Sequence, residues 1–288
     1  MTTGSKAHIV VVWIVIAVLA SSAAILTRYC GIPAASIGFW RVFGAAVILM
    51  PFCLRARLTL PGTRLLTKGA ILAGVFLGLH FATWCWSIQH TTIANASLFI
   101  GVQPLIAPFI AHFLTRDRLN RWEYVAVALA TAGMVWLFGG QMLLSRKDLA
   151  GTGVALLSAV LCATYFVLGR RYRASQHILL FSVGVYVTAA AVQALGACVF
   201  EGGIRIGAGY TPLALLGLIL LPTVGGHTLA MYLLRHVKPQ VVVFSVPSQF
   251  VLTTVAAVPL FGEAPSLWFY PGAALIVSGV VLGIAKAE

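Results

Sequence analysis

The chain has 288 residues, of which 60% are hydrophobic and 9% are charged, and its formal net charge is +13. Because soluble domains carry about 25% charged residues, this composition excludes an ordinary water-soluble fold and favours a protein whose solvent is the lipid bilayer. The positive charge does not indicate nucleic-acid binding, because the basic residues lie in short clusters between long apolar runs.

Ten apolar stretches follow one another along the chain, each close to the roughly 20 helical residues that cross the hydrocarbon core. The first five are Ile9–Thr27, Ser36–Leu54, Gly69–Ile88, Ile93–Leu114 and Trp122–Phe138. The second five are Gly151–Gly169, Ile178–Phe200, Pro212–Leu234, Val241–Phe261 and Leu267–Ala285. The connections between them are short. The sequence therefore predicts an all-α integral membrane protein of ten transmembrane helices.

Lysine and arginine residues gather in alternate connections. If the N-terminus is cytoplasmic, 14 of the 19 fall on the cytoplasmic side and 4 on the other, and Arg41 lies inside the second stretch. Cytoplasmic loops of membrane proteins carry an excess of Lys and Arg. We therefore expect both termini in the cytoplasm and the protein in the cell (inner) membrane.

The two halves of the chain share short sequence matches in the same order, at offsets between 143 and 147 residues. The matches are Arg28-Tyr29 with Arg171-Tyr172, Gly78-Leu79-His80 with Gly225-Gly226-His227, Pro104 with Pro247, Trp122 and Tyr124 with Trp268 and Tyr270, and Ala132-Gly133 with Ser278-Gly279. Because each half has an odd number of helices, the second half must enter the membrane from the opposite face. We therefore predict inverted repeats, residues 1–145 and 146–288, around a central cavity, a common plan among secondary transporters.

In these features the chain resembles the drug/metabolite transporter superfamily, and specifically its EamA-type permeases. Besides the ten helices in two repeats, the resemblance rests on Ala163-Thr164-Tyr165 before Gly169-Arg170-Arg171, on Pro104 and Pro247, and on Leu260-Phe261-Gly262-Glu263 before the last helix. The first-half counterpart of that turn, Thr115-Arg116-Asp117-Arg118-Leu119, departs from the family pattern. The resemblance implies export of small metabolites through a central cavity. More narrowly, the chain looks like the YddG-type aromatic amino-acid exporters.

His80 and His227 are repeat-equivalent and lie near the middle of the third and eighth stretches. Ionisable groups inside a bilayer are costly, so a functional role is the first interpretation. An imidazole both donates and accepts hydrogen bonds, and it titrates near neutral pH. The pair could therefore bind a carboxylate or amino group of a substrate, or carry a proton. The alternative is that each ring bonds to a carbonyl of a neighbouring helix.

Aromatic residues lie at similar depth. Trp84 follows His80 by four residues and so shares its helix face, and Phe99 and Tyr165 are further candidates for stacking against a planar or apolar substrate group. The alternative is an ordinary lipid-facing or interfacial position. That interfacial position is what we expect for four other tryptophans, Trp13, Trp40, Trp122 and Trp268.

Amide and hydroxyl side chains gather near the two prolines of the fourth and ninth stretches. They are Asn95, Gln103, Ser245, Ser248 and Gln249. Proline frees a helix carbonyl about one turn earlier. With those carbonyls, we expect Asn95, Ser245 and Gln249 to bind the ammonium group of a zwitterion. The alternative is hydrogen bonding between helices. Pro104 and Pro247 are also candidate hinges.

All six acidic residues fall at helix ends or in loops. Ion-coupled carriers often place a carboxylate within the membrane, so this distribution favours facilitated diffusion or coupling through histidine. It also disfavours a strongly cationic substrate. An anionic phosphate substrate would need a buried Lys or Arg, and only Arg41 qualifies, which either snorkels or faces the cavity. The five cysteines have no metal or redox spacing, so no cofactor is expected.

The sequence therefore predicts a secondary transporter that exports small neutral or zwitterionic metabolites, with aromatic amino acids favoured, by alternating access. One alternative is a broad drug or nucleotide-sugar carrier of the same fold. Another is a membrane-embedded enzyme, although the chain has no HExxH, paired carboxylates or nucleophile elbow. We expect a monomer or weak homodimer, because Gly74-x-x-x-Gly78 and Gly279-x-x-x-Gly283 favour internal packing over dimerisation.

Overall fold

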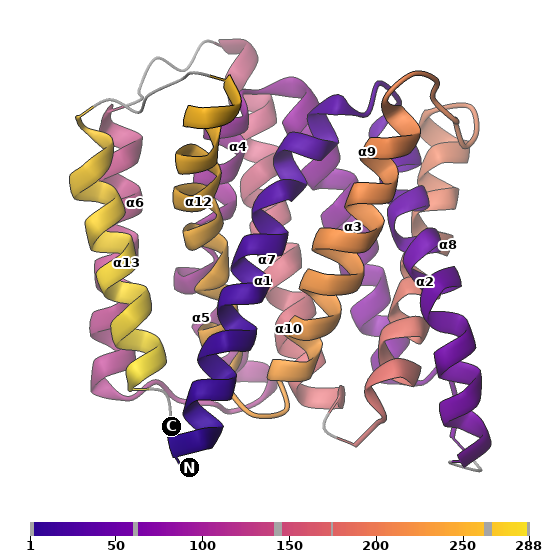
Figure 1. Ribbon diagram of the computed structural model, residues 1–288, viewed down its shortest axis with the longest axis horizontal. Coiled ribbons are helices and arrows are strands. Elements are labelled where there is room, and N and C mark those ends of the chain that lie inside the picture. The colour runs from indigo at the N-terminus through magenta and orange to yellow at the C-terminus, as the bar shows by residue number, and fades with distance from the viewer. Residues whose placement is uncertain (1–2, 60–62, 141–145, 174, 262–266, 287–288) are drawn as a thin grey trace.

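The computed structural model describes residues 3–59, 63–140, 146–173, 175–261 and 267–286, and every regular element among them is helical (Figure 1). The first half contains α1 (Thr3–Tyr29), α2 (Ala34–Thr59), α3 (Lys68–His90), α4 (Ile93–Ile100), α5 (Gln103–Leu114) and α6 (Arg121–Gly140). The second contains α7 (Arg146–Arg173), α8 (Ile178–Phe200), α9 (Thr211–Leu218), the π-helix η1 (Ile219–His227), α10 (Thr228–Leu233), α11 (Pro239–Val243), α12 (Ser245–Phe261) and α13 (Phe269–Ala285).

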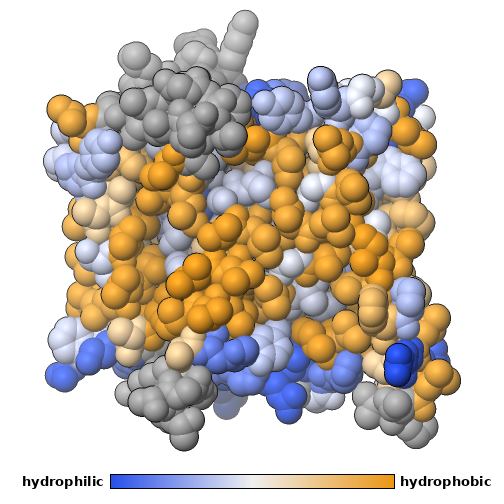
Figure 2. All heavy atoms as spheres, in the orientation of Figure 1, coloured by the Kyte–Doolittle hydropathy of each residue, from blue (hydrophilic) through white to orange (hydrophobic). Residues whose placement is uncertain are grey.

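The helices stand side by side across one slab, and α1 begins at the face where α13 ends (Figure 1). Within the described residues, eight helical stretches are long and apolar enough to cross a membrane, and the shorter apolar stretches Pro239–Val255 and Phe269–Ala285 complete ten. Figure 2 shows a broad hydrophobic band, with hydrophilic residues gathered along the edge that carries the termini. The predicted all-α fold with ten crossings is confirmed, and the chain is a multi-pass membrane protein.

The two halves interleave rather than pack as separate bodies. Helix α3 packs along α7 and α8 of the other half, and α1 packs along α9, η1 and α10. Exchanging the two halves converts the α3–α7 pairing into that of α1 with α9, η1 and α10, and the α3–α8 pairing into that of α2 with α9 and η1. Helix α2 also packs on its own equivalent α8, and α6 packs on its equivalent α13. The main buried apolar cluster accordingly draws residues from both halves. The predicted boundary between residues 145 and 146 adjoins residues 141–145, which lie outside the described part.

Two predicted spans differ from the expectation of one continuous helix. The fourth breaks at Gly101 and Val102, between α4 and α5, and the ninth breaks at Phe244, between α11 and α12. Each break begins three residues before Pro104 or Pro247. Proline lacks the N–H that an α-helix needs, and its ring clashes with the carbonyl four residues earlier. The same break therefore occurs in both repeats, and the hinge role of the prolines stays a prediction.

The eighth predicted span changes its helical type midway. Residues Ile219–His227 form η1, which contains Pro222, and Thr223 Oγ1 donates a hydrogen bond of 2.7 Å to Leu218 O. The equivalent region of α3, around His80, is regular α-helix. π-helical segments inside helices frequently occur at functional sites. The repeat symmetry is therefore broken at the level of the two histidines.

Glu201, directly after α8, ties that helix to the start of α2. Its carboxylate accepts hydrogen bonds from Ala35 N (2.6 Å), Ser36 N (2.9 Å) and Ser36 Oγ (2.7 Å). Free N–H groups and the helix dipole both favour an anion at this place. We expect Glu201→Gln to lower the free energy of unfolding by about 1–2 kcal/mol, measured as a lower melting temperature in detergent. The control Arg205→Gln, at an exposed residue, should change it little; an unchanged melting temperature for Glu201→Gln would contradict this.

Candidate functional site

A cavity lies where the two repeats meet. Its volume is about 60 Å³, several times the roughly 10–15 Å³ that one water molecule needs and well below the roughly 300 Å³ of small ligand pockets. Helices α1 to α5 of the first half line it together with α7, η1, α10 and α12 of the second. Both repeats therefore build the wall of this small cavity.

The wall is mainly apolar, with a few polar groups. The polar residues are Arg41, His80, Gln103, His227, Ser245 and Gln249, and the aromatic residues other than histidine are Phe81, Trp84 and Phe166. Small-molecule sites typically combine apolar and aromatic walls with a small number of placed polar groups. Five of the eight predicted substrate-binding residues line the cavity, namely His80, Trp84, His227, Ser245 and Gln249.

The other three predicted residues, Asn95, Phe99 and Tyr165, lie outside the wall of this cavity. Asn95 Nδ2 donates to Thr91 Oγ1 (3.3 Å), and the Phe99 ring packs edge-on against Phe138 at 5.3 Å. Since Ile100 faces the cavity, helical geometry turns Phe99 away by roughly 100° and Asn95 by roughly 140°.

Tyr165 lies behind the wall, one residue before Phe166. It is fully buried, and its ring centre lies 5.7 Å from that of His227. Its neighbour Phe166 and Cys162, one helical turn earlier, face the cavity instead. Tyr165 therefore supports His227 from behind.

The two repeat-equivalent histidines meet in the cavity but differ in environment. Their ring centres are 6.4 Å apart. Nδ1 of His80 lies 2.8 Å from Ser158 Oγ and 3.1 Å from Ser158 O on α7, so this nitrogen follows the alternative expectation of a bond to a neighbouring helix. Nδ1 of His227 is buried and has no hydrogen-bond partner among the described residues. The His227 ring stacks on Phe166 and meets Phe81 edge-on.

For Arg41 the sequence left open whether the side chain snorkels to the membrane surface or faces the cavity. Its side chain does not snorkel: it is 1% exposed and forms part of the cavity wall. Nε donates a hydrogen bond of 2.6 Å to Thr223 Oγ1, and the guanidinium carbon lies 3.9 Å from the centre of the Phe81 ring. Tyr186 OH donates to Thr223 O and thereby supports the same turn of η1. A lone arginine inside an apolar run was the signal in the sequence.

The carboxylates with a described placement are all engaged away from this cavity. Asp117 pairs with Arg170 (3.8 Å), Glu123 pairs with Lys238 (3.0 Å), and Glu201 caps α2. Among the described residues, no acidic side chain lines the cavity, so Arg41 has no protein counter-charge there. In the predicted motif Leu260-Phe261-Gly262-Glu263, the last two residues lie outside the described part.

Comparison with known proteins settles the family. The sequence profile described as EamA-like transporter family matches residues 8–139 and, a second time, residues 149–284, once in each half. The chain belongs to the EamA-like transporter family. It is therefore a membrane transporter of the drug/metabolite superfamily, as the resemblance implied.

Two curated relatives of this EamA-like chain carry transporter names without a substrate. The chain is 28% identical over 64 residues to the "Uncharacterized transporter YojE" of Bacillus subtilis (strain 168), and the match covers 22% of each protein. It is 30% identical over 70 residues to the "Uncharacterized transporter PA0485" of Pseudomonas aeruginosa (strain PAO1), covering 23% of this chain and 24% of that protein. The matched segments thus span about a quarter or less of these relatives.

A solved structure described as "Crystal structure of protein" has the same fold as this EamA-like chain. The TM-score is 0.79, the match covers 98% of this chain and 99% of the other, and 21% of the aligned residues are identical. At this identity the likeness shows the fold alone.

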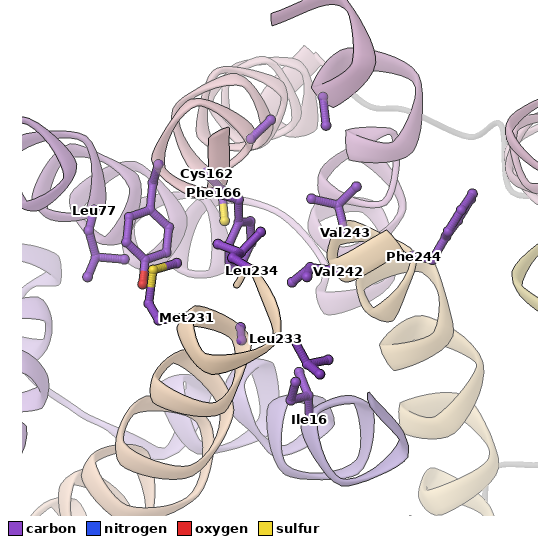
Figure 3. Packing of buried hydrophobic residues seen from close by; sticks show 14 of the residues in the cluster. Ile16, Leu77, Cys162, Phe166, Met231, Leu233, Leu234, Val242, Val243 and Phe244 are labelled. Carbon is purple, nitrogen blue, oxygen red and sulfur yellow. The ribbon is translucent and has the colours of Figure 1, made fainter. Parts of the chain in front are cut away.

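Packed apolar residues lie between the cavity of this EamA-like transporter and the face that carries the termini. Figure 3 shows part of one packed apolar cluster, which includes Ile16 of α1, Phe166 of α7, Leu234 directly after α10 and Val242 of α11. Trp13 belongs to this layer: it is buried, and its Nε1 donates a hydrogen bond of 3.0 Å to Val241 O. The expected interfacial position of Trp13 is therefore wrong, because α1 packs along the second repeat at this depth.

Toward the opposite face the open space continues. A second, smaller cavity shares Trp84, Ile100 and Gln249 with the first and extends to Ser97 and Thr253. Compared with Ile100 and Gln249, Ser97 and Thr253 lie nearer the ends of α4 and α12 that are remote from the termini. The site is thus asymmetric, with a packed layer on one side and further space on the other.

Proposed function

We propose that this transporter exports small amino-acid-like metabolites through the central cavity, with aromatic amino acids favoured. The observation that carries the proposal is the cavity wall itself. Trp84, Phe81 and Phe166 offer ring surfaces for an apolar or planar side chain, and His227 and Gln249 offer polar groups beside them. A zwitterion with an aromatic side chain has this combination of groups.

Alternating access is the mechanism that we propose for this transport. The helix breaks at Gly101 and Phe244 support it, because their neighbours Ile100 and Ser245 line the cavity. A substrate in the cavity would therefore lie beside the points where two helices can change direction. Inverted-repeat carriers commonly place interrupted helices at the substrate site.

We also propose that the termini lie in the cytoplasm and that the membrane is the inner membrane. Most of the basic residues lie in clusters at helix ends on the face that carries the termini. These are the C-terminal ends of α2, α5, α7, α10 and α13 and the N-terminal ends of α3 and α6. In this orientation the packed layer would close the cavity from the cytoplasm, and the remaining space would lead outward.

Trp84 and Trp86 provide a matched test of the proposed site. Trp84 lines the cavity, whereas Trp86 stacks on His90 at 3.8 Å and lies outside the cavity wall. Uptake of a labelled amino-acid panel into proteoliposomes should show saturable movement of phenylalanine and tryptophan by the wild type. We expect Trp84→Ala to reduce it about tenfold or more, because a stacked ring contributes about 1 kcal/mol beyond its buried area. Trp86→Ala should stay near the wild type.

The same assay tests the mode of transport. Acceleration by a pH gradient would indicate proton coupling, for which His227 is the candidate, and indifference to the gradient would indicate facilitated diffusion. If folded wild-type protein moves no amino acid, the proposed substrate class is wrong, and drugs or nucleotide sugars would be tested next. Equal effects of the two tryptophan substitutions would contradict the proposed site.

A further inference from the structure

We propose that Arg41 binds a carboxylate of the substrate, and that this ion pair, rather than a contact to the ammonium group, selects what the cavity accepts. The inference deepens the proposed function and rests on it. The charges of the site are unbalanced: the guanidinium group of Arg41 lies in the cavity wall, and no described acidic side chain lies there with it. A buried charge without a partner costs several kcal/mol, so a counter-ion is expected from elsewhere.

The contacts of Arg41 leave part of its guanidinium free. Nε is occupied by Thr223 Oγ1, and Phe81 covers a face of the group at 3.9 Å. Nη1 is buried and has no hydrogen-bond partner among the described residues. Carboxylates are frequently bound by two parallel N–H groups of an arginine. The structure thus holds the arginine by one nitrogen and one ring face and leaves a donor for an anion.

Thr223 fixes the direction in which the Arg41 side chain points. Thr223 Oγ1 donates its own hydrogen to Leu218 O, so toward Arg41 it serves as an acceptor. The turn that carries Thr223 belongs to η1, which also supplies His227 to the cavity. An arginine from the first repeat is therefore oriented by the second repeat at the cavity.

Gln103 is a buried acceptor that the cavity offers to an ammonium group, beside the wall residues Ser245 and Gln249. It is 1% exposed, and its Oε1 has no hydrogen-bond partner among the described residues. A neutral amide oxygen binds an ammonium group more weakly than a carboxylate does. The carboxylate of an amino acid would thus form an ion pair and its ammonium only a neutral contact. Since Arg41 supplies one positive charge, a singly charged carboxylate matches it better than a doubly charged phosphate.

Competition against labelled phenylalanine in proteoliposomes tests which group is recognised. N-acetylphenylalanine keeps the carboxylate and loses the ammonium group, whereas phenylalaninamide and phenylethylamine lose the carboxylate. We expect N-acetylphenylalanine to compete within about tenfold of phenylalanine, and the amide and amine to be about 30-fold weaker or more. If phenylalaninamide competes as well as phenylalanine, the assignment to Arg41 is wrong while the proposed function stands.

Substitutions of Arg41 separate a binding role from a structural one. In Arg41→Met, an apolar chain replaces the cation, and we expect affinity for the carboxylate ligands to fall about 30-fold or more while affinity for phenylethylamine is unchanged or higher. Arg41→Lys should keep the preference for carboxylates. A merely structural role would weaken all ligands alike. Binding is measured by thermal stabilisation of monodisperse protein, which also shows that each variant is folded.

The carboxylate site can also be tested if the wild type moves no amino acid. That result would overturn the proposed function, and the probes would then be phenylacetate and its neutral analogue phenylacetamide. We expect phenylacetate to raise the melting temperature of the wild type and not of Arg41→Met, and phenylacetamide to act on neither. Equal stabilisation by both probes, or equal stabilisation of both proteins, would refute the carboxylate site.

Discussion

Replacing Gly279 by leucine is expected to cause the largest loss of stability of any single substitution considered for this protein. A Cβ atom at Gly279 would lie 2.6 Å from Ala126 O and 2.7 Å from Ala130 N of α6, and backbone atoms cannot yield as a flexible side chain does. From α6, a Cβ atom at Gly133 would likewise lie 2.6 Å from Gly272 O of α13. We expect Gly279→Leu to destabilise the protein by about 3 kcal/mol or more, measured by melting temperature and by the yield of monodisperse protein.

Val277, two residues earlier on α13, provides the control. Its side chain is 46% exposed on the outer surface, so Val277→Leu should change the melting temperature little. The comparison also tests the predicted use of the Gly279-x-x-x-Gly283 pair. A Gly279→Leu protein that melts like the wild type but elutes at a different oligomeric size would show that the glycine serves dimerisation instead.

The second large effect is expected for Glu123→Ala. Glu123 is fully buried at the start of α6, where it accepts hydrogen bonds from Asn120 N (2.7 Å) and from Lys238 Nζ (3.0 Å) before α11. Removing one partner of a buried ion pair leaves the other charge without compensation. Because Lys238 is 17% exposed and also donates to Arg118 O, we expect a loss of about 2–3 kcal/mol, below the full penalty for a buried pair.

Asp117→Ala is the matched control for this ion pair. Asp117 lies 3.8 Å from Arg170 and both side chains are partly exposed, so its loss should cost about 1 kcal/mol or less. In the double variant Glu123→Ala with Lys238→Met, part of the lost stability should return, because the unpaired charge is gone. If the double variant is less stable than Glu123→Ala alone, the ion-pair explanation is wrong.

The Glu123–Lys238 pair also joins the two repeats at the face that carries the termini, on the side of the packed apolar residues. If alternating access operates as proposed, Glu123→Ala should favour opening toward this face. In a variant that keeps Cys162 as its only cysteine, reaction of this cavity-lining thiol with a water-soluble maleimide should then become several-fold faster. An unchanged rate, with the melting temperature lowered, would show that the pair stabilises the fold without controlling access.

The sequence by itself determined the class of the protein, the number of crossings and the pairing of the halves. It did so because a bilayer allows only helices of limited length and strong hydrophobicity to cross, so apolar runs such as Ile178–Phe200 report the spans directly. The matches of Arg28 with Arg171 and of His80 with His227 then related the two halves. From the histidine match we predicted that both residues serve one site, and their ring centres lie 6.4 Å apart.

Only the tertiary structure decided which side of each helix faces the cavity. In a soluble protein the polar face of a helix marks its exposed side, but in lipid both faces are apolar and helix rotation is set by packing against neighbours. For this reason the sequence did not show that Asn95 and Phe99 lie outside the cavity wall or that Trp13 is buried, and the direction of Arg41 could not be read from its position in the chain. Thr223 in the π-helical segment accepts a hydrogen bond from Arg41 of the other repeat, and no local pattern in the sequence records this contact.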